Sequence, residues 1–178
     1  RISKTTTQSG NSQTTYYAYG SSGLLAELND QGVVTKAYGW NPQSADLWST
    51  APLWQAETNP QNASLSNSAT AYHYLHTDHL ETPVLGTDKS GTQTWKAISE
   101  AFGETKVDTA STITMNLRFA GQYFDDESGL HQNYFRDYHS RSGRYIQRDP
   151  IGLSGGMNGH GYAGLNPITN ADPFGLSA

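Results

Sequence analysis

Short apolar and aromatic stretches alternate with glycine-rich polar turns along most of the chain. The first such stretches lie at residues 16–19, 24–28 and 33–40, and the turns at 20–23 and 29–32 separate them. Tyrosine, valine and leucine favour strands, whereas glycine, asparagine and aspartate favour turns. Strands separated by turns about every ten residues predict an antiparallel all-β meander of hairpins.

The same rhythm resumes after residue 70. We expect strands over 72–75, 83–87 and 92–97. The segment 87–103 loosely repeats the glycine and aromatic spacing of 23–39, which indicates a hairpin unit used more than once. Such units bury their faces by stacking on neighbouring units.

A third unit follows from residue 119, with one continuous strand expected over 130–138. Side chains alternate between the two faces of a strand. We therefore expect Arg136 to share a face with Tyr134 and Tyr138.

Residues 41–67 depart from the pattern. They contain three prolines among serine, threonine, asparagine and glutamine, which predicts a long loop. Trp48 and Trp54 are apolar anchors, so we expect the loop to pack against the rest of the protein.

Composition narrows the possible classes of protein. The 178 residues are 35% hydrophobic, with 11 tyrosines and four tryptophans against two methionines, so the core must be rich in aromatic rings. A net charge of −5 and the lack of a dense basic run argue against nucleic-acid binding. No apolar run of about 18 residues is present to span a membrane. Without cysteine there is no disulfide framework. The chain begins at Arg1 without a visible signal peptide, and we expect it to be a piece of a longer protein.

Two near copies of one motif lie at the end of the chain, Asp-Pro-Ile-Gly-Leu at 149–153 and Asp-Pro-Phe-Gly-Leu at 172–176. A residue before proline avoids helical geometry, and the following glycine permits a positive φ. The glycine-rich segment 155–164 allows the chain to fold back, which would bring Asp149 to Asp172. Paired carboxylates share a proton, so one can activate water while the other polarises a carbonyl. Asp-Pro pairs are, however, usually plain turn formers.

Several motifs in sequence order carry a family resemblance. They lie at 72–80, 101–104, 117–125, 143–153, 162–167 and 172–176. Together they resemble the C-terminal core of RHS-repeat, or YD-repeat, proteins, a family that includes bacterial polymorphic toxins and the C components of insecticidal toxin complexes. The resemblance is strong from 72 to 176 and weak from 16 to 40.

The resemblance implies a long antiparallel ribbon coiled into a hollow shell, with an irregular glycine- and proline-rich plug at one end. It divides the chain into degenerate repeat hairpins with the loop at 1–70 and a core domain at 71–178. It also implies intramolecular aspartyl autoproteolysis, which frees a C-terminal toxin held inside the shell. Carried over to this sequence, the catalytic residues are Asp149, Asp172 and Arg136, and the cut falls between Leu176 and Ser177. A chain of 178 residues supplies only part of such a shell.

Alternatives remain for these roles. Arg136 can equally form a structural ion pair with Asp125 or Glu127, and Arg148 is the second candidate for the catalytic arginine. Arg148 directly precedes Asp149 and should point to the opposite face of a strand. The hydroxyl of Ser177 can also attack the Leu176 carbonyl and form an ester that then hydrolyses.

No cofactor or metal is expected. His73, His76 and His79 share a face only in a helix, and their surroundings predict strand and turn. The glycine loop lacks the lysine and the following helix of a phosphate site.

The expected partners are the rest of the shell, the toxin domain and secretion or delivery proteins, in a bacterial protein made in the cytoplasm and exported. The competing hypothesis is a non-catalytic scaffold or a carbohydrate- or partner-binding ribbon.

Overall fold

The protein is an all-β molecule with two antiparallel sheets, as the turn pattern predicted. The computed structural model describes residues 1–44, 48–59, 61 and 63–177. The first sheet has nine strands in chain order: β1 (Ser3–Gln8), β2 (Asn11–Gly20), β3 (Gly23–Leu28), β4 (Val34–Trp40), β5 (Pro52–Glu57), β6 (Ala71–Thr77), β7 (Pro83–Thr87), β8 (Gln93–Ser99) and β9 (Thr105–Val107). The second sheet has four: β10 (Gln122–Asp125), β11 (Leu130–Asn133), β12 (Arg136–His139) and β13 (Arg144–Tyr145).

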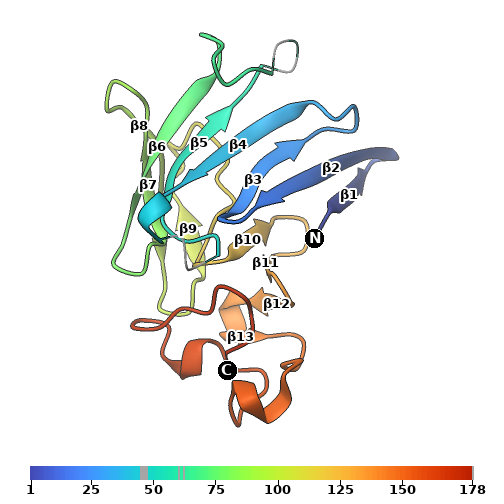
Figure 1. The fold of residues 1–178 in the computed structure, drawn as a ribbon, viewed down its shortest axis with the longest axis vertical. Helices are drawn as coiled ribbons and strands as arrows, with labels where there is room; N and C mark the ends of the chain where they lie inside the picture. The colour runs from blue at the N-terminus through green and yellow to red at the C-terminus, as the bar shows by residue number, and fades with distance from the viewer. Residues whose placement is uncertain (45–47, 60, 62, 178) are drawn as a thin grey trace.

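Each strand pairs with the next along the chain, so both sheets are meanders (Figure 1). The first sheet curves across the upper part of the view, and the second lies below it. The C-terminal turns, drawn in orange and red, lie under the second sheet at the bottom. The ribbon is not closed on itself, which fits a fragment of a larger shell.

The helical segments are short. They are the 3-10 turns η1 (Pro42–Ser44), η2 (Ser140–Ser142), η3 (Gly152–Gly155) and η4 (Ala163–Leu165). Within the described ranges, no helix is long and apolar enough to cross a membrane.

Alternation along the strands produces the core. In β6, His73 and Leu75 are buried while Tyr74 and His76 are exposed, which is the period of two that a half-buried strand requires. Aromatic residues dominate the interior, with Trp95 only 1% exposed in the first sheet. A second core lies under β12 and β13 and contains Tyr138, Tyr145, Tyr162 and Ala163.

The loop predicted over 41–67 contains a strand, so that prediction is wrong for its middle part. Pro52–Glu57 forms β5 and pairs with β4 and β6. Pro52 is the first residue of β5, a position where the missing N–H is tolerated. Trp54 packs on the ring of Tyr72, as expected of an anchor. Residues 45–47, 60 and 62 of this loop lie outside the described residues.

The strand predicted over 130–138 is also wrong, because the chain reverses direction in its middle. Tyr134 has φ 48°, and β11 and β12 pair with each other on either side of Tyr134 and Phe135. Tyr134 is consequently 44% exposed, while Arg136 and Tyr138 are buried at 2% and 0%. Arg136 thus shares its buried side with Tyr138 but not with Tyr134.

The proposed division at residue 70 stays a prediction, and the first sheet runs continuously through that position.

Candidate active site

The two Asp-Pro motifs form matching bends. In each, the glycine has a positive φ, 64° at Gly152 and 66° at Gly175, as predicted. The glycine N–H donates to the carbonyl oxygen of the motif's own aspartate, at 3.0 Å for Asp149 and 3.3 Å for Asp172. The two bends therefore share the same backbone geometry at the glycine.

Arg136 lies between these two aspartates. Its Nη2 is 3.1 Å from Asp149 Oδ2 and 3.3 Å from Asp172 Oδ2. The side chains of Arg136 and Asp149 are fully buried, and that of Asp172 is 4% exposed. The structure thus brings together all three residues singled out from the sequence. Buried charges of this kind are tolerated only when they are paired and hydrogen-bonded.

The remaining donors of Arg136 are directed at backbone carbonyls. Its Nε donates to the Gly175 oxygen at 2.5 Å, and its Nη1 donates to the Gly159 oxygen at 3.2 Å. The guanidinium carbon lies 3.6 Å from the centre of the Tyr145 ring, within the range of a cation–π contact. The guanidinium is therefore fixed in orientation, and it ties both bends to β12.

The sequence also left Asp125 and Glu127 as possible partners of Arg136, and Arg148 as the second candidate for the catalytic arginine. The contacts of these residues in the structure are different. Asp125 forms ion pairs with Arg1 and Lys4, and Glu127 forms one with Lys4. Neither acid is the partner of Arg136. Arg148 is exposed, while its neighbour Asp149 is buried.

Asp172 binds the peptide at the predicted junction. Its Oδ1 accepts from the Leu176 N–H and its Oδ2 from the Ser177 N–H, both at 2.9 Å. The second of these N–H groups belongs to the Leu176–Ser177 peptide bond itself. Tyr145 also donates to Oδ2, at 2.8 Å. The carboxylate thus holds the nitrogen that cleavage would release.

Asp149 is held differently. Its Oδ1 accepts from the Ile151 N–H at 2.9 Å. Its Oδ2 is buried and, among the described residues, has the ion pair to Arg136 but no hydrogen-bond partner. A Cβ atom added to Gly155 would lie 2.3 Å from this oxygen and 3.0 Å from the Leu176 carbonyl oxygen. Asp149 Oδ2 and the Leu176 carbonyl oxygen therefore both lie next to the position of that added atom.

Tyr145 is a site residue that the sequence did not single out. Burial raises the pKa of its hydroxyl, and the neighbouring Asp172 raises it further, so the hydroxyl stays protonated and donates. Asn133 Nδ2 donates to the Tyr145 hydroxyl at 2.7 Å and to the Asp172 backbone oxygen at 2.9 Å. In the sequence, Tyr145 is marked only by its place in the motif at 143–153. That motif does not indicate which residues Tyr145 contacts.

The three histidines of the 72–80 motif point to separate partners. His73 contacts the hydroxyl of Thr94, His76 that of Thr87, and His79 the carbonyl of Ile168. No group of three histidine, cysteine or acidic side chains suited to hold a metal is found in the part of the chain that the structure describes.

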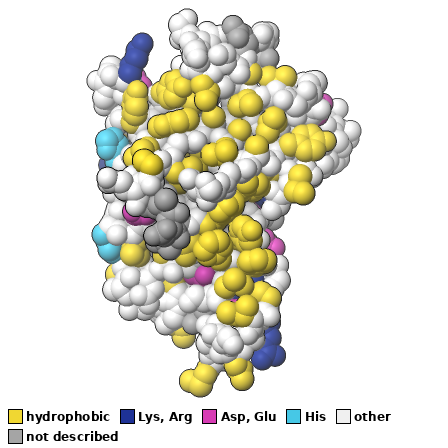
Figure 2. Space-filling view, in the orientation of Figure 1, with side chains coloured by type: hydrophobic (Ala, Val, Ile, Leu, Met, Phe, Trp, Pro, Cys, Tyr) yellow, Lys and Arg dark blue, Asp and Glu magenta, His cyan; other side chains and the backbone are white. Residues whose placement is uncertain are grey.

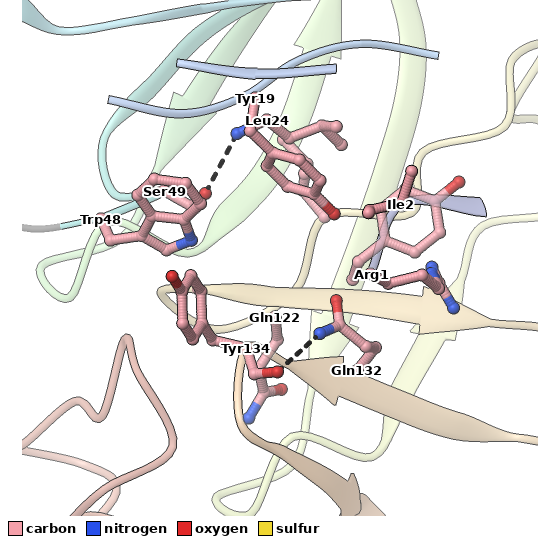
Figure 3. Close-up of a pocket in the computed structure, with 12 residues that line it drawn as sticks. Arg1, Ile2, Tyr19, Leu24, Trp48, Ser49, Gln122, Gln132 and Tyr134 are labelled. Atoms are coloured by element: carbon pink, nitrogen blue, oxygen red, sulfur yellow. Dashed lines mark hydrogen bonds between the residues drawn. The ribbon is translucent and has the colours of Figure 1, made fainter. Parts of the chain in front are cut away.

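A second feature is a pocket of about 220 Å³ where the two sheets meet. Figure 2 shows hydrophobic side chains gathered over this face of the molecule, from the first sheet down to the second. In the close-up of Figure 3, the rings of Tyr19, Trp48 and Tyr134 line one side of the pocket. Trp48 stacks on Tyr19 and contacts Tyr134 edge-on, with ring centres 5.7 and 5.2 Å apart. Aromatic rings thus connect the first sheet to the hairpin that carries Arg136.

Comparison with known proteins identifies related chains. Residues 53–155 match the model of the Teneurin YD-shell family. The chain is 36% identical over 165 residues to the double-stranded DNA deaminase toxin A of Burkholderia cenocepacia. This match covers 86% of the chain and 11% of the toxin. It is 39% identical over 103 residues to the toxin protein Tse5 of Pseudomonas aeruginosa, covering 58% of this chain and 8% of Tse5.

A solved structure shows the same fold. The crystal structure of TcdB2-TccC3 without its hypervariable C-terminal region superimposes with a TM-score of 0.58 and 20% sequence identity. The match covers 96% of this chain but 9% of that one. The chain therefore spans about a tenth of the length of the two toxins and of this structure.

Proposed function

The chain belongs to the Teneurin YD-shell family, and from this premise we propose that it is the end of a toxin shell that cuts its own backbone between Leu176 and Ser177. Its bacterial relatives are toxins, and the fold is that of an RHS or YD shell fragment. The cut would free a C-terminal toxin domain enclosed by the rest of the shell. We propose that the parent is an exported bacterial protein whose partners are that toxin, the remaining shell and delivery proteins.

One observation carries the proposal: two buried carboxylates share one arginine, and one of these carboxylates accepts from the N–H of the peptide bond at the junction. Asp172 accepts the Ser177 N–H. Asp149 Oδ2 and the Leu176 carbonyl oxygen both lie next to the position of a Cβ atom added to Gly155. A carboxylate near the carbonyl and another at the nitrogen can hydrolyse a peptide bond by general acid–base catalysis.

The reaction is a hydrolysis with balanced proton transfers. Asp149 takes a proton from a water molecule as the water oxygen bonds to the Leu176 carbonyl carbon. The tetrahedral intermediate then breaks its carbon–nitrogen bond, and the acid pair returns a proton to the Ser177 nitrogen, which leaves as an amine. Asp172 accepts the Ser177 N–H before the reaction, so the proton that the nitrogen gains is the one that Asp149 took from the water. The pair ends with the protons that it had at the start.

Arg136 and Tyr145 support this chemistry. The guanidinium keeps two acidic groups side by side in a buried site by offsetting their negative charge. Tyr145 fixes Asp172 against the junction. Catalyst and substrate share one chain, so the effective concentration is high and each molecule reacts once.

The test uses a chain extended past Ala178, purified without added protease and analysed by intact mass. We expect two fragments that meet between Leu176 and Ser177. Asp149→Asn and Asp172→Asn should each slow cleavage by at least about 10²-fold, the lower range for loss of a general acid or base. Asp126→Asn, at an exposed aspartate, is the matched control and should cleave normally.

Ser177→Ala separates the two chemical routes. Attack by water predicts cleavage at the parental rate, whereas attack by the serine hydroxyl predicts that cleavage stops. A full-length product in the parent chain overturns self-cleavage altogether.

The pocket between the sheets supports a second candidate function, a non-catalytic scaffold that binds a partner or a carbohydrate. Pockets that bind ligands are lined mainly by hydrophobic and aromatic side chains, and this pocket has such a lining. This candidate predicts a stable uncut chain whose binding is lost with Trp48→Ala and retained with Asp149→Asn.

A further inference from the structure

We propose that Gly155 is a positioning residue of this reaction, because its missing side chain leaves the space in which Asp149 meets the Leu176 carbonyl. The inference rests on the proposed self-cleavage and adds a residue to it. Gly155 ends η3, the short turn that begins inside the first Asp-Pro motif, at Gly152. In the sequence it was one of several glycines in a flexible linker, with nothing to distinguish it.

The distances define the role. A Cβ atom at position 155 would lie 2.3 Å from Asp149 Oδ2, 2.8 Å from Asp149 Cγ and 3.0 Å from the Leu176 oxygen. Contacts below 3.0 Å force one group to move. The Asp149 side chain is fully buried and held at Oδ1 by Ile151, so the group displaced would be the carboxylate itself. The same atom would press on the backbone carbonyl that the water must attack.

The backbone of Gly155 does not require glycine. Twelve glycines of the chain have a positive φ, which side chains rarely adopt, and Gly155 is not one of them. Alanine is therefore compatible with the local conformation, and the obstacle is the contact with Asp149. This separates Gly155 from Gly152 and Gly175, where the bend itself needs a positive φ.

Gly155→Ala in the extended chain tests the proposal, with Ser154→Ala as the matched control. Ser154 is the preceding residue in η3 and is exposed. We expect Ser154→Ala to cleave within about twofold of the parent and Gly155→Ala to be slower by about 10²-fold, the cost of a small misplacement of a reacting group. Cleavage of Gly155→Ala at the parental rate overturns the proposal.

The pH profile distinguishes positioning from general loosening. If Asp149 is displaced, hydroxide must replace it, so the residual rate of Gly155→Ala should rise about tenfold per pH unit. A structural defect lowers the rate by the same factor at every pH, and that result overturns the assignment.

A stability cycle covers the case in which Gly155→Ala folds poorly. In an Asp149→Ala chain the Asp149 Cγ and Oδ2 are gone, so Gly155→Ala should lower the melting temperature less than it does in the parent. An equal decrease in both backgrounds overturns the proposal. These outcomes are distinct from failure of self-cleavage, in which the parent stays whole or Asp149→Asn cleaves like the parent.

Discussion

The first sheet and the C-terminal region, residues 122–177, both bury carboxylates, but they hold them in different ways. In the first sheet, Glu27 is 6% exposed, and its Oε1 accepts from the hydroxyl of Tyr38 in β4 at 2.5 Å and from that of Tyr123 in β10 at 2.9 Å, so one donor comes from the C-terminal region. In the C-terminal region, Asp149 and Asp172 share one guanidinium, and Asp149 Oδ2 is left without a hydrogen bond. An acid whose Oε1 is held by two hydroxyl groups, as in Glu27, acts as a structural element. Asp149 Oδ2 keeps its ion pair with Arg136 but has no hydrogen bond, and in the proposed reaction it is the oxygen that takes the proton.

The two regions also differ in how their structure is specified. The first sheet is stabilised by alternating buried side chains and aromatic packing at many positions, in a core that also includes Tyr123 of β10. The C-terminal turns are held by a few buried polar groups, and the single side chain of Arg136 contacts both bends, Gly159 and Tyr145. Single substitutions should therefore have larger effects in the C-terminal region.

The largest effect on stability is expected at Arg136. Arg136→Met leaves two buried carboxylates without their cation and should lower the free energy of unfolding by about 3–5 kcal/mol, measured by urea denaturation. Arg141→Met is the control, because the Arg141 side chain is 79% exposed in its pair with Glu104 and should contribute less than about 1 kcal/mol. Equal losses at both positions would remove the contrast between the buried and the surface arginine.

An intermediate effect is expected from acid. Burial, with added repulsion from Arg118 and His139, lowers the pKa of His131 to about 3 from its ordinary value of 6.5. The unfolded chain therefore binds a proton at this residue before the folded chain does, and stability falls as the pH drops below 6.5. Between pH 6.5 and 5 we expect a loss of about 1.5 kcal/mol.

Urea denaturation at the two pH values measures this loss. His131→Gln, which cannot titrate, should show a smaller decrease than the parent. The exposed His76→Gln should behave like the parent. A parental decrease in His131→Gln would assign the acid sensitivity to other groups.

The smallest effect is expected in the first sheet. Tyr38→Phe removes one of the two donors to Glu27 and should cost about 1 kcal/mol, because Tyr123 still donates. Tyr72→Phe, which removes an exposed hydrogen bond to the Leu65 carbonyl, should change stability by less than about 0.5 kcal/mol. Thermal unfolding compares the two. A loss at Tyr38 as large as that at Arg136 would mean that the first sheet also depends on single polar contacts.

Much of the fold was predictable from the sequence, because alternation and glycine turns are local signals. The pattern located strands close to β2, β3, β4, β6, β7 and β8. It missed β5, where prolines and polar residues hid a strand that long-range pairing stabilises. It also missed the reversal at Tyr134, because a positive φ at a non-glycine residue has no sequence signature.

The candidate site was predictable in part for the same reason. The duplicate motifs singled out Asp149 and Asp172, and the family resemblance added Arg136. Tyr145 and Gly155 were not predicted, because their roles depend on contacts between segments far apart in the chain. The hydroxyl of Tyr145 reaches Asp172, and the bare backbone of Gly155 lies next to Asp149 and Leu176.

The most direct test of the central claim is to refold the extended chain from denaturant and follow cleavage over a 100-fold range of protein concentration. Cleavage in cis predicts a first-order rate that is independent of concentration, a released fragment that begins at Ser177, and no product from Asp149→Asn. A rate that rises with concentration, a cut at another bond, or normal cleavage of Asp149→Asn would contradict the claim.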